Sequence, residues 1–158
     1  MLSNYRRYIA VLLALTLAVA TNVSAQNNSS DDELTDQFGL QYWNKLKPEA
    51  IQTESGLQYK ILIEGKGPKP RKKDSVLVHY RGLLLNGIEF DSSYNSDEPI
   101  KLKVRKVIEG WTEGIQLMPV GSVYVFLIPP ELAYGGRKVP SIPPNSTLIF
   151  SIELFGIK

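Results

Sequence analysis

The sequence contains no cysteine and a single histidine, His79, among its 158 residues. These absences exclude thiol nucleophiles, disulfide bridges, cysteine-rich zinc sites and metal sites built from several histidines. We therefore expect neither a metal nor a cofactor. With 43% hydrophobic and 22% charged residues, the composition is that of an ordinary soluble domain, which argues against a disordered, collagen-like or polytopic membrane protein.

Motifs for nucleophilic catalysis and phosphate binding are also missing. There is no Gly-x-Ser-x-Gly sequence, and Gly65-Lys66-Gly67 lacks the second glycine and the Lys-Ser/Thr pair of a phosphate loop. His79 stands in the middle of an expected strand, which favours a structural or solvated role. The basic run of Lys69 and residues 71–73 fits either a contact with an anionic partner or, as we prefer, a solvated turn.

Residues 1–25 have the pattern of a secretory signal peptide, with cleavage expected after Ala25. The apolar run of residues 9–20 is shorter than the roughly 20 residues that a membrane anchor needs. Removing Arg6 and Arg7 leaves 16 of 18 basic residues against 16 acidic ones. We therefore expect a formally neutral, periplasmic or secreted protein that binds no nucleic acid and does not stay inserted in a membrane.

Residues 26–52 predict a disordered leader that contains one short helix. Leu34, Phe38, Tyr42 and Leu46 are spaced four residues apart, as on one face of a helix, and Pro48 ends the pattern. We expect the folded domain to span residues 53–158.

Within that domain, alternating apolar residues predict strands around residues 57–63, 76–80, 100–104 and 148–154. The continuously apolar run 123–128 predicts a central strand covered on both faces. Its second face needs a cover, either the segment 34–46 or a partner. The spacing of Ile108, Trp111, Ile115 and Met118 predicts the domain's one helix. The expected fold is α+β: a curved antiparallel sheet of five to six strands wrapped around one short α-helix.

Five aromatic residues are expected to face the same interior: Tyr80, Phe90, Trp111, Tyr134 and Phe150. They fit either an ordinary core or a cup for a small apolar ligand. The loop of residues 129–146 holds five of the ten prolines, which makes it stiff, and loops of this length are usually functional.

The sequence resembles the FK506-binding-protein (FKBP) family of peptidyl-prolyl cis-trans isomerases over about residues 53–158. The matching motifs are Val-His-Tyr-Arg-Gly at 78–82, Phe-Asp-Ser-Ser at 90–93, Val-Ile-Glu-Gly-Trp at 107–111, Pro-Pro-Glu-Leu-Ala-Tyr-Gly at 129–135, and Ile-Pro-Pro-Asn at 142–145 followed by Leu-Ile-Phe at 148–150. The fold of the family agrees with the one expected from periodicity.

The resemblance implies a pocket with Trp111 as its floor and Tyr80, Phe90, Val107, Ile108, Ile142 and Phe150 as its walls. It also implies that the Ile108 N–H and the Tyr134 hydroxyl donate hydrogen bonds to ligand carbonyls, and that Asp91 lies at the rim. Ile100 replaces an aromatic residue of some relatives. Ser96 replaces an arginine that pairs with the rim aspartate in many of them, which leaves the orientation of Asp91 open.

The function implied is isomerisation of X-Pro bonds during folding of secreted proteins, by desolvation in an apolar pocket and without a cofactor. Expected partners are unfolded or nascent proline-containing polypeptides and macrolides like FK506 and rapamycin. The alternative is a module or holdase chaperone that binds proline segments with little turnover. Residues 26–52 are too short for the helical dimer domain of longer relatives, so we expect a monomer.

Overall fold

A computed structural model describes residues 38–96 and 98–158, with side chains from Gln41 onward. The predicted signal peptide, its cleavage site and Leu34 of the predicted helical stripe lie outside the described residues. Within the described ranges, no helix is both long and apolar enough to cross a membrane.

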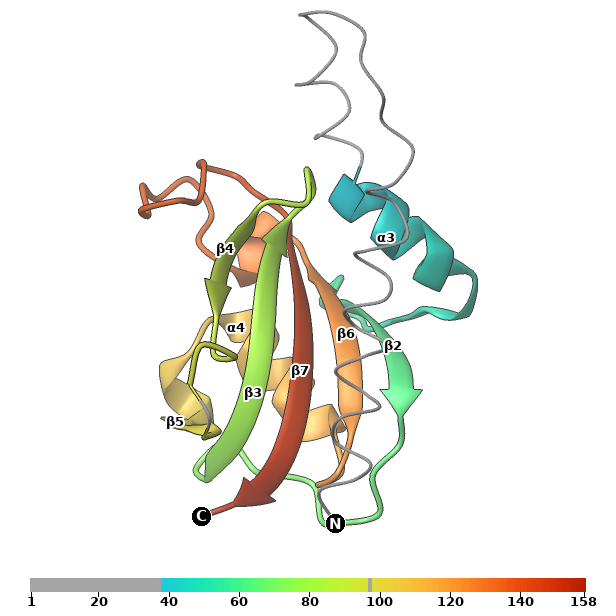
Figure 1. The fold of residues 1–158 in the computed structure, drawn as a ribbon, viewed down its shortest axis with the longest axis vertical. Coiled ribbons are helices and arrows are strands. Elements are labelled where there is room, and N and C mark those ends of the chain that lie inside the picture. The colour runs from blue at the N-terminus through green and yellow to red at the C-terminus, as the bar shows by residue number, and fades with distance from the viewer. Residues whose placement is uncertain (1–37, 97) are drawn as a thin grey trace, which may run out of the picture. The chain divides into compact units, whose positions relative to one another are not determined.

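The centre of the structure is one antiparallel sheet of seven strands (Figure 1). The strands are β1 (Ile51–Gln52), β2 (Gln58–Ile63), β3 (Ser75–Leu84), β4 (Glu89–Ser92), β5 (Ile100–Lys103), β6 (Val123–Ile128) and β7 (Leu148–Ile157). Their order is β1-β2-β6-β7-β3-β4, and β5 pairs separately with β3. The antiparallel architecture is confirmed, but the expected count of five to six strands is too low.

The additional strands are β1 and β4, which have two and four residues. The two residues of β1 are too few to alternate, and β4 contains a single apolar residue, Phe90, so neither strand shows a period. The predicted strand at 100–104 also ends one residue early, because Val104 begins a short 3₁₀ turn, η2 (Val104–Lys106). Both α3 and β1 precede Thr53, where the domain was expected to start.

Helix α4 (Glu109–Leu117) packs against one face of the sheet and confirms the predicted helix. Two glycines allow its close approach to β6. A Cβ atom on Gly110 would lie 2.5 Å from Ile128 Cγ2, and one on Gly114 would lie 2.7 Å from Phe126 Cε1. Both distances are far inside van der Waals contact. The helix therefore keeps two poor helix formers because any larger residue would push it off the sheet.

The main apolar core lies between α4 and the sheet. Trp111 and Ile115 of α4 meet alternate residues of the central strands, among them Tyr124, Phe126 and Ile152, all at most 5% exposed. Burying one large apolar side chain stabilises a fold by about 1.5–3 kcal/mol. The position of α4 is thus determined mainly by this packing.

The opposite face of the sheet is covered by α3 (Phe38–Leu46), which is followed by the 3₁₀ turn η1 (Lys47–Glu49). Trp43 is 2% exposed and packs with Val125 of β6 and Ile149 of β7. Tyr42 and Leu46 of the predicted stripe are only partly buried beside them. The second face of the central strand β6 is thus covered by the helical segment, which was one of the two alternatives for this face. Strand β6 is covered on both faces, as predicted.

Replacing Trp43 by alanine is expected to lower the free energy of unfolding by about 3–5 kcal/mol, because it removes the largest side chain of this second cluster. Urea denaturation followed by circular dichroism measures the change. The neighbouring exposed residue Asn44 provides the control, since Asn44→Ala should change the free energy by less than about 0.5 kcal/mol. Equal stabilities of the two variants would show that α3 does not pack on the sheet in solution.

Candidate functional site

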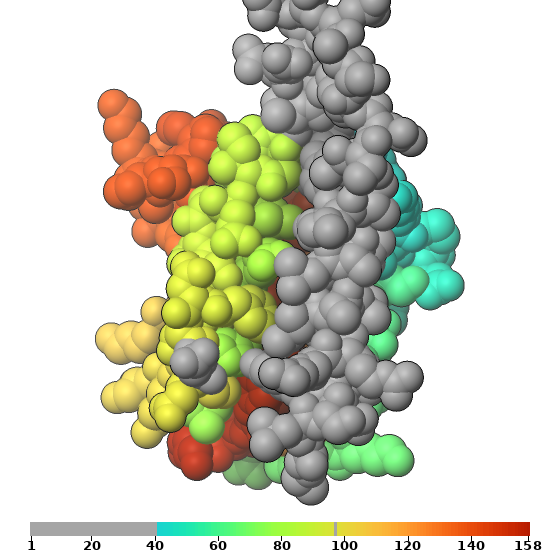
Figure 2. All heavy atoms as spheres, in the orientation of Figure 1, coloured from blue at the N-terminus to red at the C-terminus, as the bar shows by residue number. Residues whose placement is uncertain are grey.

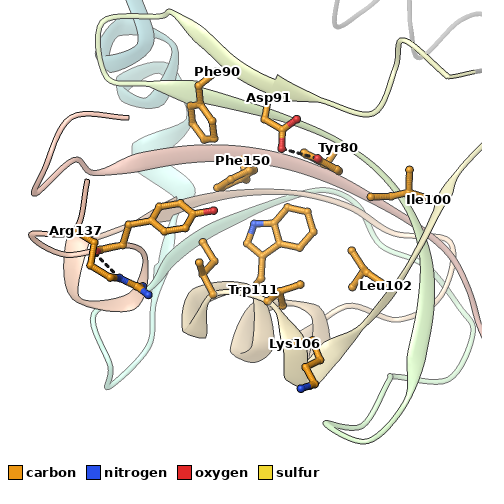
Figure 3. Close-up of a pocket in the computed structure, with 12 residues that line it drawn as sticks. Tyr80, Phe90, Asp91, Ile100, Leu102, Lys106, Trp111, Arg137 and Phe150 are labelled. Atoms are coloured by element: carbon orange, nitrogen blue, oxygen red, sulfur yellow. Dashed lines mark hydrogen bonds between the residues drawn. The ribbon is translucent and has the colours of Figure 1, made fainter. Parts of the chain in front are cut away.

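A cavity of about 520 Å³ opens between α4, β3, β4, β5, β7 and the loop after β6 (Figure 3). Its lining is largely aromatic and aliphatic. The lining residues are Tyr80, Phe90, Asp91, Ile100, Leu102, Lys106, Val107, Ile108, Trp111, Tyr134, Arg137 and Phe150. A mostly apolar cavity of this size with a few polar groups is suited to a small ligand or to one side chain of a peptide with its neighbours.

Trp111 lies at the centre of an aromatic cluster that forms the floor of this cavity. Its ring contacts Tyr80 and Phe150 edge-to-face, with centroids 5.0 and 5.1 Å away and interplanar angles of 82° and 87°. Phe90 meets Phe150 at 5.4 Å and 89°. Edge-to-face pairs at such distances are favourable beyond their buried area. The four rings therefore hold one another in place.

The Trp111 indole Nε1 is buried and has no hydrogen-bond partner among the described residues. A buried donor without a partner costs free energy.

Gly82 leaves the space that the Phe90 and Phe150 pair occupies. A Cβ atom at this position would lie 2.7 Å from both Phe150 Cε1 and Phe90 Cζ. Glycine in β3 is thus required for the two phenyl rings to meet across the sheet and form one wall.

Tyr80 fixes the carboxylate at the rim. Its hydroxyl donates a 2.6 Å hydrogen bond to Asp91 Oδ2. Burial and the neighbouring Asp91 carboxylate raise the pKa of Tyr80 well above its ordinary value, so the phenol stays protonated and remains a donor. Asp91 is thus oriented by a tyrosine in a sequence that has Ser96 at the position of the family's arginine.

His79 and Ser93 hold the backbone that carries Tyr80. The Tyr80 N–H donates to Ser93 Oγ at 2.8 Å, and the Ser93 N–H donates to the Tyr80 carbonyl at 3.0 Å. His79 Nδ1 lies 3.0 Å from the same Ser93 Oγ, and the imidazole, 1% exposed, stacks on Tyr94. His79 therefore has a structural role, behind the pocket wall.

The proline-rich loop delivers Tyr134 to the pocket. A short 3₁₀ turn, η3 (Pro130–Leu132), begins it, and the Gly135 N–H donates to the Pro130 carbonyl at 2.9 Å. Arg137 Nε donates to the Tyr134 carbonyl at 3.0 Å, and its Nη2 donates to the Ala133 carbonyl at 3.2 Å. These bonds give the loop one defined shape without a long helix or strand.

Comparison with known proteins identifies the family and the fold of the chain. The family described as FKBP-type peptidyl-prolyl cis-trans isomerase matches residues 67–155. The chain belongs to this family. This FKBP-type chain is 42% identical to the FKBP-type peptidyl-prolyl cis-trans isomerase FkpA of Aeromonas hydrophila over 97% of its own length and 55% of the relative. It is 49% identical to the outer membrane protein MIP of Legionella longbeachae over 73% of its length and 50% of the relative.

Among solved structures, FkpA from Escherichia coli matches 98% of this FKBP-type chain and 68% of that chain, with a TM-score of 0.70 and 36% identity. The crystal structure of AtFKBP13 matches 70% of this chain and 99% of that chain, with a TM-score of 0.65 and 38% identity. The chain spans about half the length of the curated relatives it matches.

The structure brings nine of the ten predicted site residues of this FKBP-type domain to the cavity. The nine are Tyr80, Phe90, Asp91, Ile100, Val107, Ile108, Trp111, Tyr134 and Phe150. Ile142 does not line it. Its side chain is 7% exposed and packs into the main core under the loop, where its N–H bonds to the Val139 carbonyl at 3.2 Å.

Three further lining residues were not predicted: Leu102, Lys106 and Arg137. Leu102 lies two residues from Ile100 on β5, so strand alternation places both on the same face and could have identified it. Lys106 and Arg137 lie outside regular strands, where no period applies. Among the described residues, no group of three or more histidine, aspartate or glutamate side chains could hold a metal ion.

The buried imidazole of His79 predicts a pH-dependent stability. Burial lowers its pKa below the usual value of about 6.5, although a hydrogen bond with Ser93 opposes the shift. Below about pH 6.5 the unfolded chain takes up a proton first, so the free energy of unfolding should fall with decreasing pH, by at most about 1.4 kcal/mol per pH unit. Urea denaturation at several pH values measures this slope.

The control for this prediction is the variant His79→Gln, which cannot titrate. Glu153 lies opposite His79 on β7, and burial raises its pKa, which gives stability the opposite dependence on pH. Subtracting the curve of the variant removes this contribution. Parallel curves for the two proteins would contradict the assignment to His79.

Proposed function

We propose that this FKBP-type domain is an active peptidyl-prolyl cis-trans isomerase that binds the proline ring over Trp111. The observation that carries the proposal is the aromatic floor, in which Trp111 is 5% exposed and is held by edge-to-face contacts with Tyr80 and Phe150. A flat apolar surface below and phenyl rings at the side suit a five-membered proline ring.

The pocket acts by desolvation and shape. Rotation about an X-Pro bond breaks amide resonance and has a barrier of roughly 18–20 kcal/mol. Water bonded to the amide oxygen favours the planar, charge-separated form. An apolar pocket that removes this water and fits the twisted amide better than the planar one lowers the barrier, with no covalent intermediate.

Two donors are suited to orient the peptide. Ile108 immediately precedes α4, and its carbonyl accepts the N–H groups of Trp111 and Thr112 at 3.0 and 2.9 Å, which fixes the backbone there. We assign the Ile108 N–H and the Tyr134 hydroxyl to carbonyls on either side of the proline. Asp91, held by Tyr80, remains at the rim, where its charge lies close to the bound amide.

The clients are proposed to be unfolded, proline-containing secreted polypeptides in the periplasm or outside the cell. The predicted signal peptide supports this location, and the relatives named FkpA are peptidyl-prolyl cis-trans isomerases by name. The monomeric state stays a prediction, which light scattering of the purified protein tests.

The domain is expected to accelerate isomerisation of an Ala-Leu-Pro-Phe peptide in a protease-coupled assay. Trp111→Ala should lower kcat/KM at least about tenfold, because about 1.4 kcal/mol of transition-state stabilisation corresponds to that factor. Tyr134→Phe removes one neutral hydrogen bond and should lower it about two- to tenfold.

Tyr124→Phe is the matched control, because the Tyr124 hydroxyl bonds to Glu64 at 3.3 Å and does not line the cavity. It should leave kcat/KM unchanged. A rate equal to that in buffer alone would rule out the isomerase activity. Suppressed aggregation of a proline-independent client that survives Trp111→Ala would then favour the holdase alternative.

FK506 is expected to bind in the same cavity and to change the fluorescence of Trp111. The sequence has two tryptophans, and Trp43 lies on the other face of the sheet. The titration is therefore made in Trp43→Phe, which keeps an aromatic ring in the second cluster. A saturable change should appear there and be absent in Trp111→Phe, which reports Trp43 alone. A change in both variants would place the macrolide elsewhere.

A further inference from the structure

Two cations, Lys106 and Arg137, line the cavity together with its apolar floor. We call them the rim cations. Lys106 comes from the 3₁₀ turn before α4, and Arg137 comes from the proline-rich loop. In Figure 3 Arg137 lies on the loop beside α4, Lys106 lies before the start of α4 with its amine directed away from Trp111, and Asp91 lies across the pocket. The two cations therefore stand at separate edges of the pocket, and the flexible side chain of Lys106 has to turn to face a ligand seated on Trp111.

Within the described residues, neither rim cation forms an ion pair with a carboxylate. The ion pairs in the described part of the chain are Lys60–Glu49 and Arg81–Glu89, and neither includes Lys106 or Arg137. Arg137 is anchored by the Ala133 and Tyr134 carbonyls and lies 5.7 Å from the Tyr134 ring centroid. These neutral partners hold the guanidinium in place without cancelling its charge. Asp91, the single acidic residue of the lining, is tied to Tyr80 across the pocket.

Lys106 is also the end of a larger basic region. Residues 69–74 and 101–106 contain eight cations and one acidic residue, Asp74. The fold places the two segments side by side, because Ser75 pairs with Lys103 and the Val104 N–H donates to the Asp74 carbonyl at 3.1 Å. In Figure 2 the yellow segment after β4 and the orange loop protrude along the same edge of the molecule. This clustering raises the local positive potential beside the cavity.

From this arrangement we infer that the pocket prefers proline segments that carry a carboxylate next to the proline. The inference rests on the proposed function, because it assumes that proline occupies the floor. Both rim cations border the cavity, so a carboxylate beside the ring would be attracted to them, and the basic region attracts acidic chains before contact. An acidic polypeptide fits better than a membrane or a nucleic acid, since the two cations border a cavity that takes a side chain.

The test compares Ala-Glu-Pro-Phe with its neutral isostere Ala-Gln-Pro-Phe, with Ala-Leu-Pro-Phe as the reference. Isomerisation is measured by exchange NMR, which needs no protease, and peptide binding is measured by Trp111 fluorescence in Trp43→Phe. An interaction between exposed charges should favour Glu over Gln by about two- to fivefold in kcat/KM. The preference should vanish between ionic strengths of about 0.01 M and about 1 M, where the Debye length falls from about 30 Å to about 3 Å.

The variants Lys106→Glu, Lys106→Gln and Arg137→Glu should each reduce the preference, and the double charge reversal should invert it. The matched control is Lys101→Glu. Lys101 belongs to the same basic region, but it alternates on β5 with the cavity-lining Ile100 and Leu102 and is exposed away from the pocket. It should retain the preference almost unchanged. Because Lys101 and Lys106 are exposed, the unfolding curves of their variants should coincide with that of the wild type. Arg137→Glu also removes the bonds to the Ala133 and Tyr134 carbonyls, so its effect is judged by the ratio of the Glu and Gln peptides and not by the absolute rate.

The other outcomes are distinct. Equal rates and affinities for the Glu and Gln peptides, with Ala-Leu-Pro-Phe still accelerated, would overturn the inference and leave the proposed function standing. A preference that Lys101→Glu abolishes as fully as Lys106→Glu would assign the preference to the basic region as a whole and overturn the role of the rim cations.

If no peptide is accelerated, the proposed function fails, and the affinity ratio of the Glu and Gln peptides still decides the charge preference. Binding of phosphatidylglycerol vesicles that Lys106→Glu removes, with no peptide preference, would identify a membrane surface instead.

Discussion

The close contact between α4 and β6 determines where the floor of the pocket lies. Gly110 and Gly114 allow the helix backbone to approach Ile128 and Phe126 more closely than any side chain would permit. Trp111 projects from this helix, so the same approach brings its ring within edge-to-face distance of Phe150. A helix farther from the sheet would move the indole out of the range in which aromatic pairs attract one another, about 4.5–7 Å between centroids. The glycines that weaken the isolated helix are thus required by the site.

The sheet has separate tasks on its two faces. Alternation along β6 sends Phe126 toward the pocket core and Val125 toward Trp43 of α3. Helix α3 stabilises strands that also carry the aromatic walls, although it contributes no residue to the cavity lining. The strands under the rings are therefore packed on the face opposite to the pocket. This packing keeps the rings fixed although one side of the pocket is open to solvent.

Regular periodicity predicted the long strands, the helix and the inward direction of the five aromatic residues, because a residue in a strand or helix has a fixed direction relative to its neighbours. Four other lining residues, Asp91, Ile100, Val107 and Ile108, were predicted only from the resemblance to the FKBP family. Periodicity failed where that fixed direction is lost. The two-residue β1 is too short to alternate. The spacing of four residues in the N-terminal helix predicted that Tyr42 and Leu46 would face the domain. The most deeply buried side chain of this helix is instead that of Trp43, which lies between them in the sequence. Arg137 reaches the pocket through a loop whose shape depends on its own hydrogen bonds with backbone carbonyls.

In the proposed mechanism, different residues lower the isomerisation barrier and select the peptide that is bound. Twisting an amide in a dry cavity needs a fixed apolar surface, and any change to Trp111 or Phe150 alters that surface. In the proposed mechanism the charges of Lys106 and Arg137 are not needed for the twist itself, because no proton, metal or nucleophile takes part. Because Lys106 and Arg137 are exposed, a carboxylate near the ring would interact with them as in a surface ion pair, which salt screens. Residues at the rim can therefore change which chains are bound without disturbing how the bound proline turns.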